Sequence, residues 1–190
     1  EGRSASGGRG RQGAVHPRAE GTAAGHQARL RPLAGWRNGT HRAPAAGHDI
    51  NYIALAGVLG AIGEPDRKPV PPLNLVGDFG GGSMYLAFGI LCAVYEARAS
   101  GRGQVVDAAI VDGAHHLMAA VYSTMAAGSW RDGRANMLQG AAPWYSVYET
   151  QEGRYVSIGS LEPRFYQTLV ARIGLAGEFG ASQNDRSMWP

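Results

Sequence analysis

The amino-acid sequence changes character between residues 45 and 57, which read "AAGHDINYIALAG". The 44 residues before this stretch contain one Val and no Ile, Phe, Tyr or Met, so they lack the side chains that usually fill a core. After it, such residues appear at once. We therefore expect residues 1–44 to be a disordered Arg/Gly-rich leader and the core to come from residues 45–190, which are enough for a folded domain.

The formal net charge of +3 is unevenly distributed. Residues 1–45 hold eight arginines and two acidic residues, whereas residues 46–190 hold ten basic and thirteen acidic residues. This distribution argues against a nucleic-acid-binding domain. The single cysteine, Cys92, excludes a disulfide framework, and we find neither a signal-peptide core nor an apolar stretch approaching a membrane span. We expect a cytoplasmic protein.

Apolar periodicity and Gly/Pro breaks predict a mixed α and β chain. A helix is expected over 50–63, followed by a proline-rich loop over 64–78. The glycine run that begins at Gly80 predicts the start of a long apolar helix, with Ser83 as its N-cap, buried on most sides. The remaining predicted elements are a strand over 104–111, a helix over 112–128, a β-hairpin over 144–160 and an amphipathic helix over 162–175.

Three acid–base groups attract attention, although each has a structural explanation. Asp78 precedes three glycines, and the N–H groups of Gly80–Gly82 could stabilise an oxyanion at a helix start; equally, Asp78 could simply cap that helix. His48 could be structural, and Glu162 could be a surface charge at a helix N-terminus. His115 and His116 lie inside a helical pattern and are interpreted as structural. No spacing matches a metal site.

The stretches "AGHDINYI", "PPLNLVGDFGGGSMYL", "GRGQVVDAAIVDG" and "SLEPRFY" occur in this order. Together they resemble the α-methylacyl-CoA racemases of the family III CoA-transferase superfamily, from about residue 47 to residue 190. The resemblance implies a partial α/β fold of the family III CoA-transferase type, without its N-terminal Rossmann-like region and its C-terminal return. Residues 45–143 would belong to the large domain, mainly helical with a strand near 104–111, and 144–190 would begin the small domain with a hairpin and a helix. Apolar surface is then expected on the 83–97 helix.

The resemblance also implies roles for individual residues. His48 with Glu162 would form one acid/base unit and Asp78 the opposing one, which invert the α-carbon of a 2-methyl-branched acyl-CoA thioester through an enolate. Asp49 and Gly80, Gly81 and Gly82 would support the site. The expected substrate-binding residues are Tyr52, Asn74, Met84, Tyr85, Leu138 and Tyr145. No metal or separate cofactor is expected, since coenzyme A is part of the substrate. The expected partner is a second copy in an interlocked homodimer.

Two alternatives remain open. A family III CoA-transferase would use Asp78 as a nucleophile, and the presence of both His48 and Glu162 favours the racemase instead. An inactive fragment is the other alternative. The acyl chain length stays undetermined. For residues 1–44 we hypothesise a frameshifted reading or a misplaced start, because their Arg/Gly/Ala-rich composition is typical of a GC-rich gene read out of frame. Resequencing the DNA upstream of codon 45 tests this, and an intact in-frame leader would contradict it.

Overall fold

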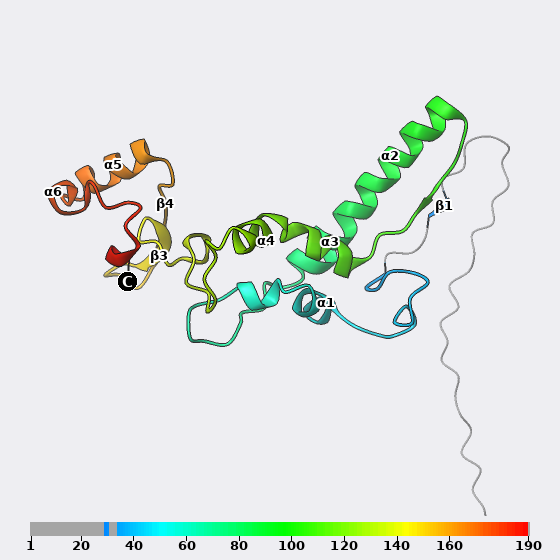
Figure 1. Cartoon of the computed structure of the whole chain (residues 1–190), viewed down its shortest axis with the longest axis horizontal. Helices are drawn as coiled ribbons and strands as arrows, with labels where there is room; N and C mark the ends of the chain where they lie inside the picture. Colours follow the sequence, from blue (N-terminus) through cyan, green and yellow to red (C-terminus); the bar gives the residue numbers. More distant parts are fainter. Residues whose placement is uncertain (1–28, 31–33, 190) are drawn as a thin grey trace, which may run out of the picture.

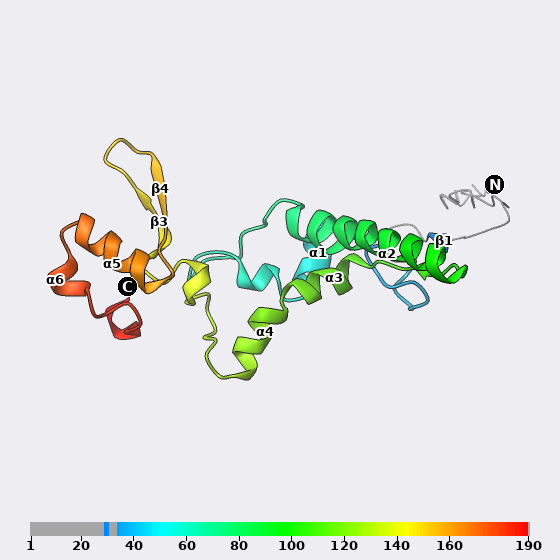
Figure 2. The same cartoon turned by 90° about the horizontal axis from the view of Figure 1, so that it is seen from above.

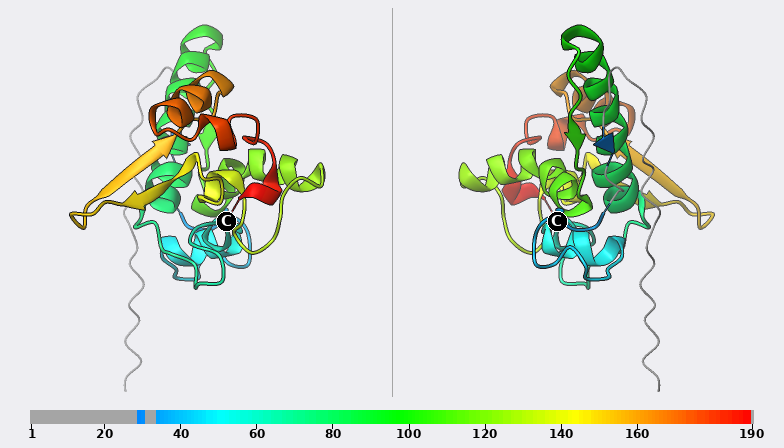
Figure 3. Two further views of the ribbon diagram at one scale, coloured as in Figure 1. Left: turned by 90° about the vertical axis from the view of Figure 1, so that its left-hand side faces the viewer. Right: turned by 90° about the vertical axis from the view of Figure 1, so that its right-hand side faces the viewer.

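The computed structural model describes residues 29–30 and 34–189. Their core consists of two small hydrophobic clusters. The described part is elongated, with the long helix at one end and the C-terminal helices at the other (Figures 1 and 2). Viewed from either end, the hairpin projects to the side of the helices (Figure 3). The elements in chain order are β1 Arg29–Leu30, α1 Asp49–Leu55, the 3₁₀ turn η1 Leu59–Ala61, the π-helix η2 Leu75–Ser83, α2 Met84–Ser100, β2 Val105–Val106, α3 Ile110–Leu117, α4 Ala119–Ala126, the 3₁₀ turn η3 Met137–Gln139, β3 Tyr145–Glu149, β4 Tyr155–Gly159, α5 Pro163–Arg172, α6 Ala176–Phe179 and the 3₁₀ turn η4 Arg186–Met188.

The predicted C-terminal hairpin and helix are confirmed. β3 and β4 pair antiparallel from Tyr145↔Gly159 to Glu149↔Tyr155. Gly153, in the connecting turn, has a φ of 70°, a conformation that glycine adopts without strain. Glu162 stands at the N-cap position of α5 without a side-chain capping bond, and the following proline occupies the first helical turn, where its missing N–H costs no hydrogen bond.

Two predicted helices are shorter than expected. The helix predicted over 50–63 ends at Leu55, because Gly57 adopts a φ of 77° and breaks it; η1 then follows as a separate turn. The helix predicted over 112–128 divides at Met118 into α3 and α4. Apolar periodicity continued across both breaks, so it did not reveal them.

The region around the glycine run differs most from the prediction. η2 includes the end of the expected loop and continues directly into α2. Ser83 has helical dihedrals and is not an N-cap; its hydroxyl donates a hydrogen bond to the Asp78 carbonyl oxygen at 2.8 Å. The glycines allow η2 to lie directly against α3, since a Cβ on Gly81 would stand 2.5 Å from the backbone nitrogen of Ala114. A Cβ on Gly113 would overlap the Gly81 carbonyl group.

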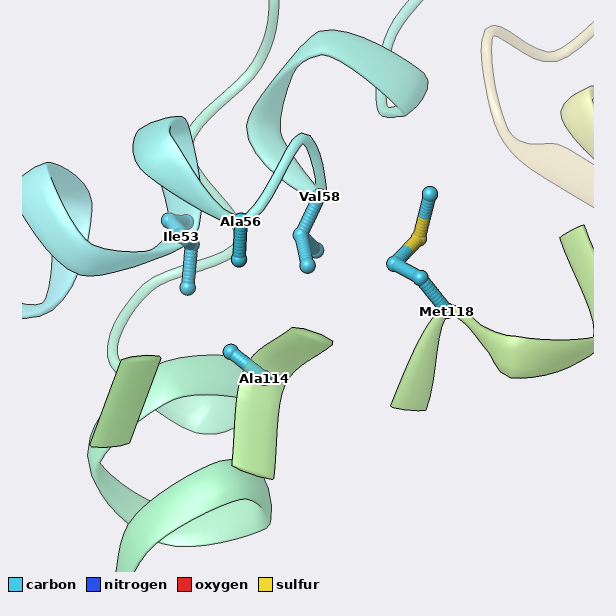
Figure 4. Close-up of a cluster of buried hydrophobic side chains, with 5 residues drawn as sticks. All are labelled: Ile53, Ala56, Val58, Ala114 and Met118. Carbon is cyan, nitrogen blue, oxygen red and sulfur yellow. The ribbon is translucent and has the colours of Figure 1, made fainter. Parts of the chain in front are cut away.

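The first hydrophobic cluster lies between α1 and α3. Its buried side chains are small or medium in size, which fits the close approach of these elements (Figure 4). They are Ile53, Ala56, Val58, Ala114 and Met118. The second cluster is more aromatic: Trp144 and Tyr166 meet edge to face with ring centroids 6.5 Å apart, joining the start of β3 to α5.

The long helix α2 is mostly exposed, so the prediction that it is buried on most sides is wrong for this chain. Only Ala93 and Ala97 are buried, whereas Phe88 is 71% exposed and Tyr95 is 78% exposed. The expected apolar surface on this helix is confirmed. By length and composition alone, the 26-residue segment Leu75–Ser100 could also cross a membrane, which corrects the expectation that no stretch approaches that length. Core helices of soluble proteins pass the same test, so this is weak evidence.

Part of the predicted leader belongs to the folded structure. β1 pairs in parallel with β2, and Ala34 forms a bridge with Ala109, which reduces the strand predicted over 104–111 to a short ladder. Arg37 forms a salt bridge of 2.9 Å with Asp112. The predicted boundary at residue 45 is therefore wrong for the described residues that precede it. Residues 1–28 and 31–33 lie outside the described residues.

Candidate active site

His48 stands at the N-terminus of α1. Its backbone is extended, with φ −129° and ψ 168°, and its N–H donates to the side-chain oxygen of Asn51 at 3.0 Å. The Asn51 N–H donates in return to the His48 carbonyl oxygen at 2.8 Å. This reciprocal pair fixes the first turn of the helix and leaves the His48 side chain exposed.

Asp49 connects α1 to η2. It is only 7% exposed, and its Oδ2 accepts the backbone N–H of Asp78 at 2.7 Å. Its Oδ1 is buried and has no hydrogen-bond partner among the described residues. A Cβ on Gly77 would collide with the Asp49 carboxylate, so the glycine before Asp78 is needed for this contact. The sequence pattern alone did not indicate that Asp49 holds Asp78.

Asp78 lies half-buried in the first turn of η2, held from two sides. Asp49 accepts its N–H, and Ser83 donates to its carbonyl oxygen. Burial, with a further contribution from the negative charge of Asp78, raises the pKa of the Tyr52 phenol above its usual value. The structure thus brings Asp49, Tyr52 and Asp78 together at the contact between α1 and η2, and His48 precedes Asp49 at the start of α1.

Tyr52 is part of the packed interior rather than of an open pocket. It is 5% exposed, and its ring meets Trp36 edge to face with centroids 5.0 Å apart. A Cβ on Gly35 or Gly47 would overlap the tyrosine ring. This burial does not favour the expected substrate contact by Tyr52. Trp36 was missed because it lies in the segment that we expected to be a leader.

Gly80–Gly82 do not form a free helix N-terminus. They lie inside η2, a π-helix, in which N–H groups are paired with the carbonyl five residues earlier. The bonds from Phe79 to Asn74, at 3.2 Å, and from Met84 to Phe79 enclose the run. The geometry therefore does not support the expectation that these N–H groups stabilise an oxyanion. The glycines serve the close contact with α3 instead.

The two histidines of α3 make contacts that join helices, in agreement with their structural interpretation. The Tyr85 hydroxyl is hydrogen-bonded to His116 Nδ1 at 2.5 Å, which ties α2 to α3. The Tyr122 hydroxyl donates to the Ala56 carbonyl oxygen at 2.6 Å and lies 3.0 Å from His115 Nδ1. Tyr85, an expected substrate-binding residue, is thus already engaged by His116.

Glu162 lies far from His48 and Asp78 within one chain. It is exposed at the start of α5, at the opposite end of the molecule from α2, and two views agree on this separation (Figures 1 and 2). The expected substrate-binding residues are divided in the same way. Asn74 and Met84 are exposed beside η2, whereas Leu138 and Tyr145 belong to η3 and β3. Among residues 29–30 and 34–189, no group of three His, Cys, Asp or Glu side chains could hold a metal ion.

The chain is similar in sequence to known proteins over most of its length. The chain is 44% identical to the alpha-methylacyl-CoA racemase of Mus musculus and 41% identical to that of Homo sapiens, each over 146 residues. These matches cover 76% of the chain but only 38% of each relative. The chain is also 30% identical, over 122 residues, to the succinyl-CoA–D-citramalate CoA-transferase of Chloroflexus aurantiacus.

Solved structures show the same fold in part. A CAIB/BAIF family protein from Brucella suis matches with a TM-score of 0.64 at 21% identity and covers 86% of this chain and 44% of its own. A hypothetical protein from Mycobacterium tuberculosis matches with a TM-score of 0.59 at 28% identity, over 85% of this chain and 42% of its own. The partial α/β fold is therefore confirmed. The profile of CoA-transferase family III matches residues 33–187, which include part of the predicted leader. The chain belongs to CoA-transferase family III.

Proposed function

We propose that this chain carries the acid–base site of a racemase that inverts the α-carbon of 2-methyl-branched acyl-CoA thioesters. The observation that supports the proposal is the Asp49–Asp78 hydrogen bond of 2.7 Å, which ties the backbone of one proposed acid–base residue to the residue that follows the other, His48. The identity to two relatives named alpha-methylacyl-CoA racemase supports the same chemistry. The chain spans 38% of their length, so the activity remains a proposal for this chain.

The proposed reaction replaces the α-proton by another proton in two steps. One group removes the α-proton from one face and leaves a planar enolate; the other returns a proton to the opposite face. Because the reaction runs in both directions, His48 and Asp78 each act once as base and once as acid. The reaction transfers protons and no electrons, so it requires no redox cofactor. Acid–base residues can carry out the proton transfers, so it requires no metal, and coenzyme A enters as part of the substrate. We also retain cytoplasmic localisation as a proposal.

Asp49 has a positioning role in this proposal. Its carboxylate holds the Asp78 backbone, while its own backbone follows His48 directly at the start of α1. A hydrogen bond from an N–H to an ionised carboxylate is worth about twice as much as a neutral one. In this proposal, Asp49 helps to hold the Asp78 backbone in position relative to the start of α1, which carries His48, because proton transfer to opposite faces depends on positioning.

Glu162 enters the proposal from a second copy of the chain. Within one chain, α5 lies at the opposite end from α2, and Glu162 is exposed at its N-terminus. An exposed carboxylate on one copy can approach the exposed His48 of another copy. We therefore propose a homodimer whose sites combine His48 and Asp78 of one chain with Glu162 of the other.

The second candidate function is CoA transfer, and the similarity to a succinyl-CoA–D-citramalate CoA-transferase favours it. In that reaction the Asp78 carboxylate attacks the thioester carbonyl, which releases the CoA thiolate and leaves an acyl–aspartyl anhydride. The thiolate then attacks the aspartyl carbonyl, which releases the acyl carboxylate and leaves an enzyme thioester. An acceptor carboxylate reverses these steps. This route needs no partner for Asp78 on the other face of the substrate.

Deuterium uptake separates the two functions. We would incubate one epimer of a 2-methylacyl-CoA in D₂O with this chain and with a fusion that adds the regions of the mouse relative outside the match. A racemase incorporates deuterium at the α-carbon while the epimer ratio approaches unity. Transfer of CoA to an added carboxylic acid without α-deuteration would overturn the racemase and support the transferase.

Mixing two inactive variants tests the shared site. His48→Ala and Glu162→Ala would each lack activity in the fusion protein, and a mixture that exchanges subunits would regain up to about a quarter of the normal site activity. This follows because random pairing gives half heterodimers, each with one intact site. The matched control mixes His48→Ala with Asp78→Ala, which share one end of the chain and regain nothing. Recovery in the control mixture instead would contradict the proposed division of the site.

A further inference from the structure

Gln183 is a buried polar residue in the turn between α6 and η4. Only 8% of it is exposed, although glutamine usually lies at protein surfaces. Its side-chain nitrogen donates to the Leu161 carbonyl oxygen at 2.8 Å and, more weakly, to the Ser160 carbonyl oxygen at 3.4 Å. Both carbonyl groups belong to the loop between β4 and α5. A buried side chain therefore holds a loop that lies 22 residues away in the sequence.

The backbone of Gln183 is itself fixed by an aromatic neighbour. The Trp144 Nε1 donates to the Gln183 carbonyl oxygen at 2.9 Å in a buried hydrogen bond. The Trp144 carbonyl oxygen also accepts the Ser160 N–H at 2.9 Å, and the Tyr166 hydroxyl donates to the Phe179 carbonyl oxygen at 2.7 Å. The loop and α5 are thus both tied to the same C-terminal segment.

This loop leads directly into Glu162, the N-cap residue of α5. The Leu161 carbonyl belongs to the planar peptide group before Glu162, so a bond to its oxygen restricts the orientation of that plane. The Glu162 carbonyl oxygen accepts the N–H groups of Phe165 and Tyr166 at 2.9 Å and 3.0 Å. Its exposed side chain has no capping partner among the described residues. The Glu162 backbone is held on both sides, and its carboxylate faces solvent.

We propose that Gln183 is a positioning residue for Glu162. Its buried amide fixes the peptide group before Glu162, and so the direction in which the glutamate side chain leaves the backbone. The inference rests on the proposed function, in which Glu162 acts with His48 of a second copy. Because a displacement of about 1 Å can slow a reaction about 100-fold, a bond that holds this backbone affects the rate without touching the substrate.

A purely structural role for Gln183 makes a different prediction. The amide satisfies buried carbonyl groups, so its loss lowers stability whatever Glu162 does. Lower stability reduces α-proton exchange from both epimers of a 2-methylacyl-CoA together. Misplacement of Glu162 reduces exchange only from the epimer whose proton His48 and Glu162 move. The two roles are therefore separated by comparing the epimers.

α-Proton exchange in D₂O with the fusion protein tests the inference, measured for each epimer and normalised to folded protein by circular dichroism. Gln183→Met removes the donor and keeps a straight side chain. It should lower exchange about 10- to 100-fold from the epimer that Glu162→Gln also impairs, and change the other less than about threefold. Gln167→Met is the matched control, because the Gln167 amide donates to the Gly180 carbonyl oxygen instead of to the loop. Both epimers should stay within about threefold in that variant.

The possible failures are distinguishable. An equal fall from both epimers in Gln183→Met, or no fall while Glu162→Gln impairs one epimer, would overturn the inference and leave the racemase proposal intact. If Glu162→Gln impairs neither epimer, the proposed role of Glu162 fails and the inference fails with it. Should Gln183→Met not fold, NMR of the unaltered 190-residue chain provides a second test. The Gln183 side-chain amide protons should exchange more slowly than those of the exposed Gln151, and equal rates would contradict the bond.

Discussion

η2 and α2 form one continuous helical segment, but they differ in how closely they pack on the rest of the chain. In η2, Gly81 packs so closely on α3 that no side chain fits between the two backbones. In α2, which follows without a break, Phe88 and Tyr95 are 71% and 78% exposed. The first half is rich in glycine and carries Asp78, whereas the second half is rich in large apolar residues. The difference shows that apolar composition alone does not determine which part of a helix is buried within one chain.

The largest effect on the free energy of unfolding is expected from a substitution in the close contact between η2 and α3. Gly113→Ala places a Cβ onto the Gly81 carbonyl group, so we expect the free energy of unfolding to fall by about 2–4 kcal/mol in urea titrations. Gly177→Ala in α6 is the matched control, since its Cβ would meet no atom within 4 Å. A neutral result for Gly113→Ala would show that α3 does not pack on η2 as described.

The hydrogen bond between Asp49 and Asp78 is expected to contribute less than the backbone contact. Asp49→Ala removes an acceptor from a partly buried N–H and should lower the free energy of unfolding by about 1.5–3 kcal/mol. Asp49→Asn keeps an acceptor oxygen and should cost less. Asp112→Ala breaks an exposed salt bridge and should cost below about 1 kcal/mol. Amide exchange at Asp78 provides the direct readout, and unchanged protection in Asp49→Ala would contradict the assignment.

The raised pKa of Tyr52 in α1 makes the stability of the fold depend on pH. A folded-state pKa above the unfolded value stabilises the fold fully below about pH 10, and this contribution is lost as the pH rises through the folded pKa. Absorbance titration should show a late phase of tyrosine ionisation from Tyr52, and Tyr52→Phe should remove that phase. Asp78→Asn should shorten the delay only in part, because burial is the larger cause. Burial also raises the pKa of Tyr148, which should keep its own late phase in both variants.

The smallest effect on the free energy of unfolding is expected on the exposed side of α2. Phe88→Gln should change the free energy of unfolding by less than about 0.5 kcal/mol, since its side chain is mostly in water already. It should also reduce self-association, measured by analytical ultracentrifugation. Ala93→Leu, on the buried side of the same helix, should cost about 1–3 kcal/mol through overpacking. Equal effects of the two substitutions would contradict the described orientation of α2.

Local signals made the C-terminal elements predictable. A glycine in the turn between β3 and β4 and a Glu-Pro pair at the start of α5 each act within a few residues, so the sequence pattern located the hairpin and the helix. The early end of α1 was not predictable from periodicity, because it depends on the left-handed conformation of Gly57. The π-helix was missed for a similar reason: a glycine run usually indicates a break, and only the contact with α3 explains a helical one.

The candidate site was predictable in its residues but not in its connections. Motifs identified His48, Asp49 and Asp78, yet the bond between the last two joins positions 29 residues apart. The attachment of Trp36 and Arg37 to the fold was missed because it depends on partners elsewhere in the chain, such as Asp112. The frameshift hypothesis for the leader stays a prediction, and the family match now extends to residue 33.

The most direct test of the proposed two-sided proton transfer is epimer-selective exchange in D₂O, measured separately for the two epimers of a 2-methylacyl-CoA with the fusion protein. If His48 and Asp78 act on opposite faces, His48→Ala loses α-proton exchange mainly from one epimer and Asp78→Ala mainly from the other, while neither variant interconverts the epimers. Equal exchange from both epimers in either variant would contradict the account.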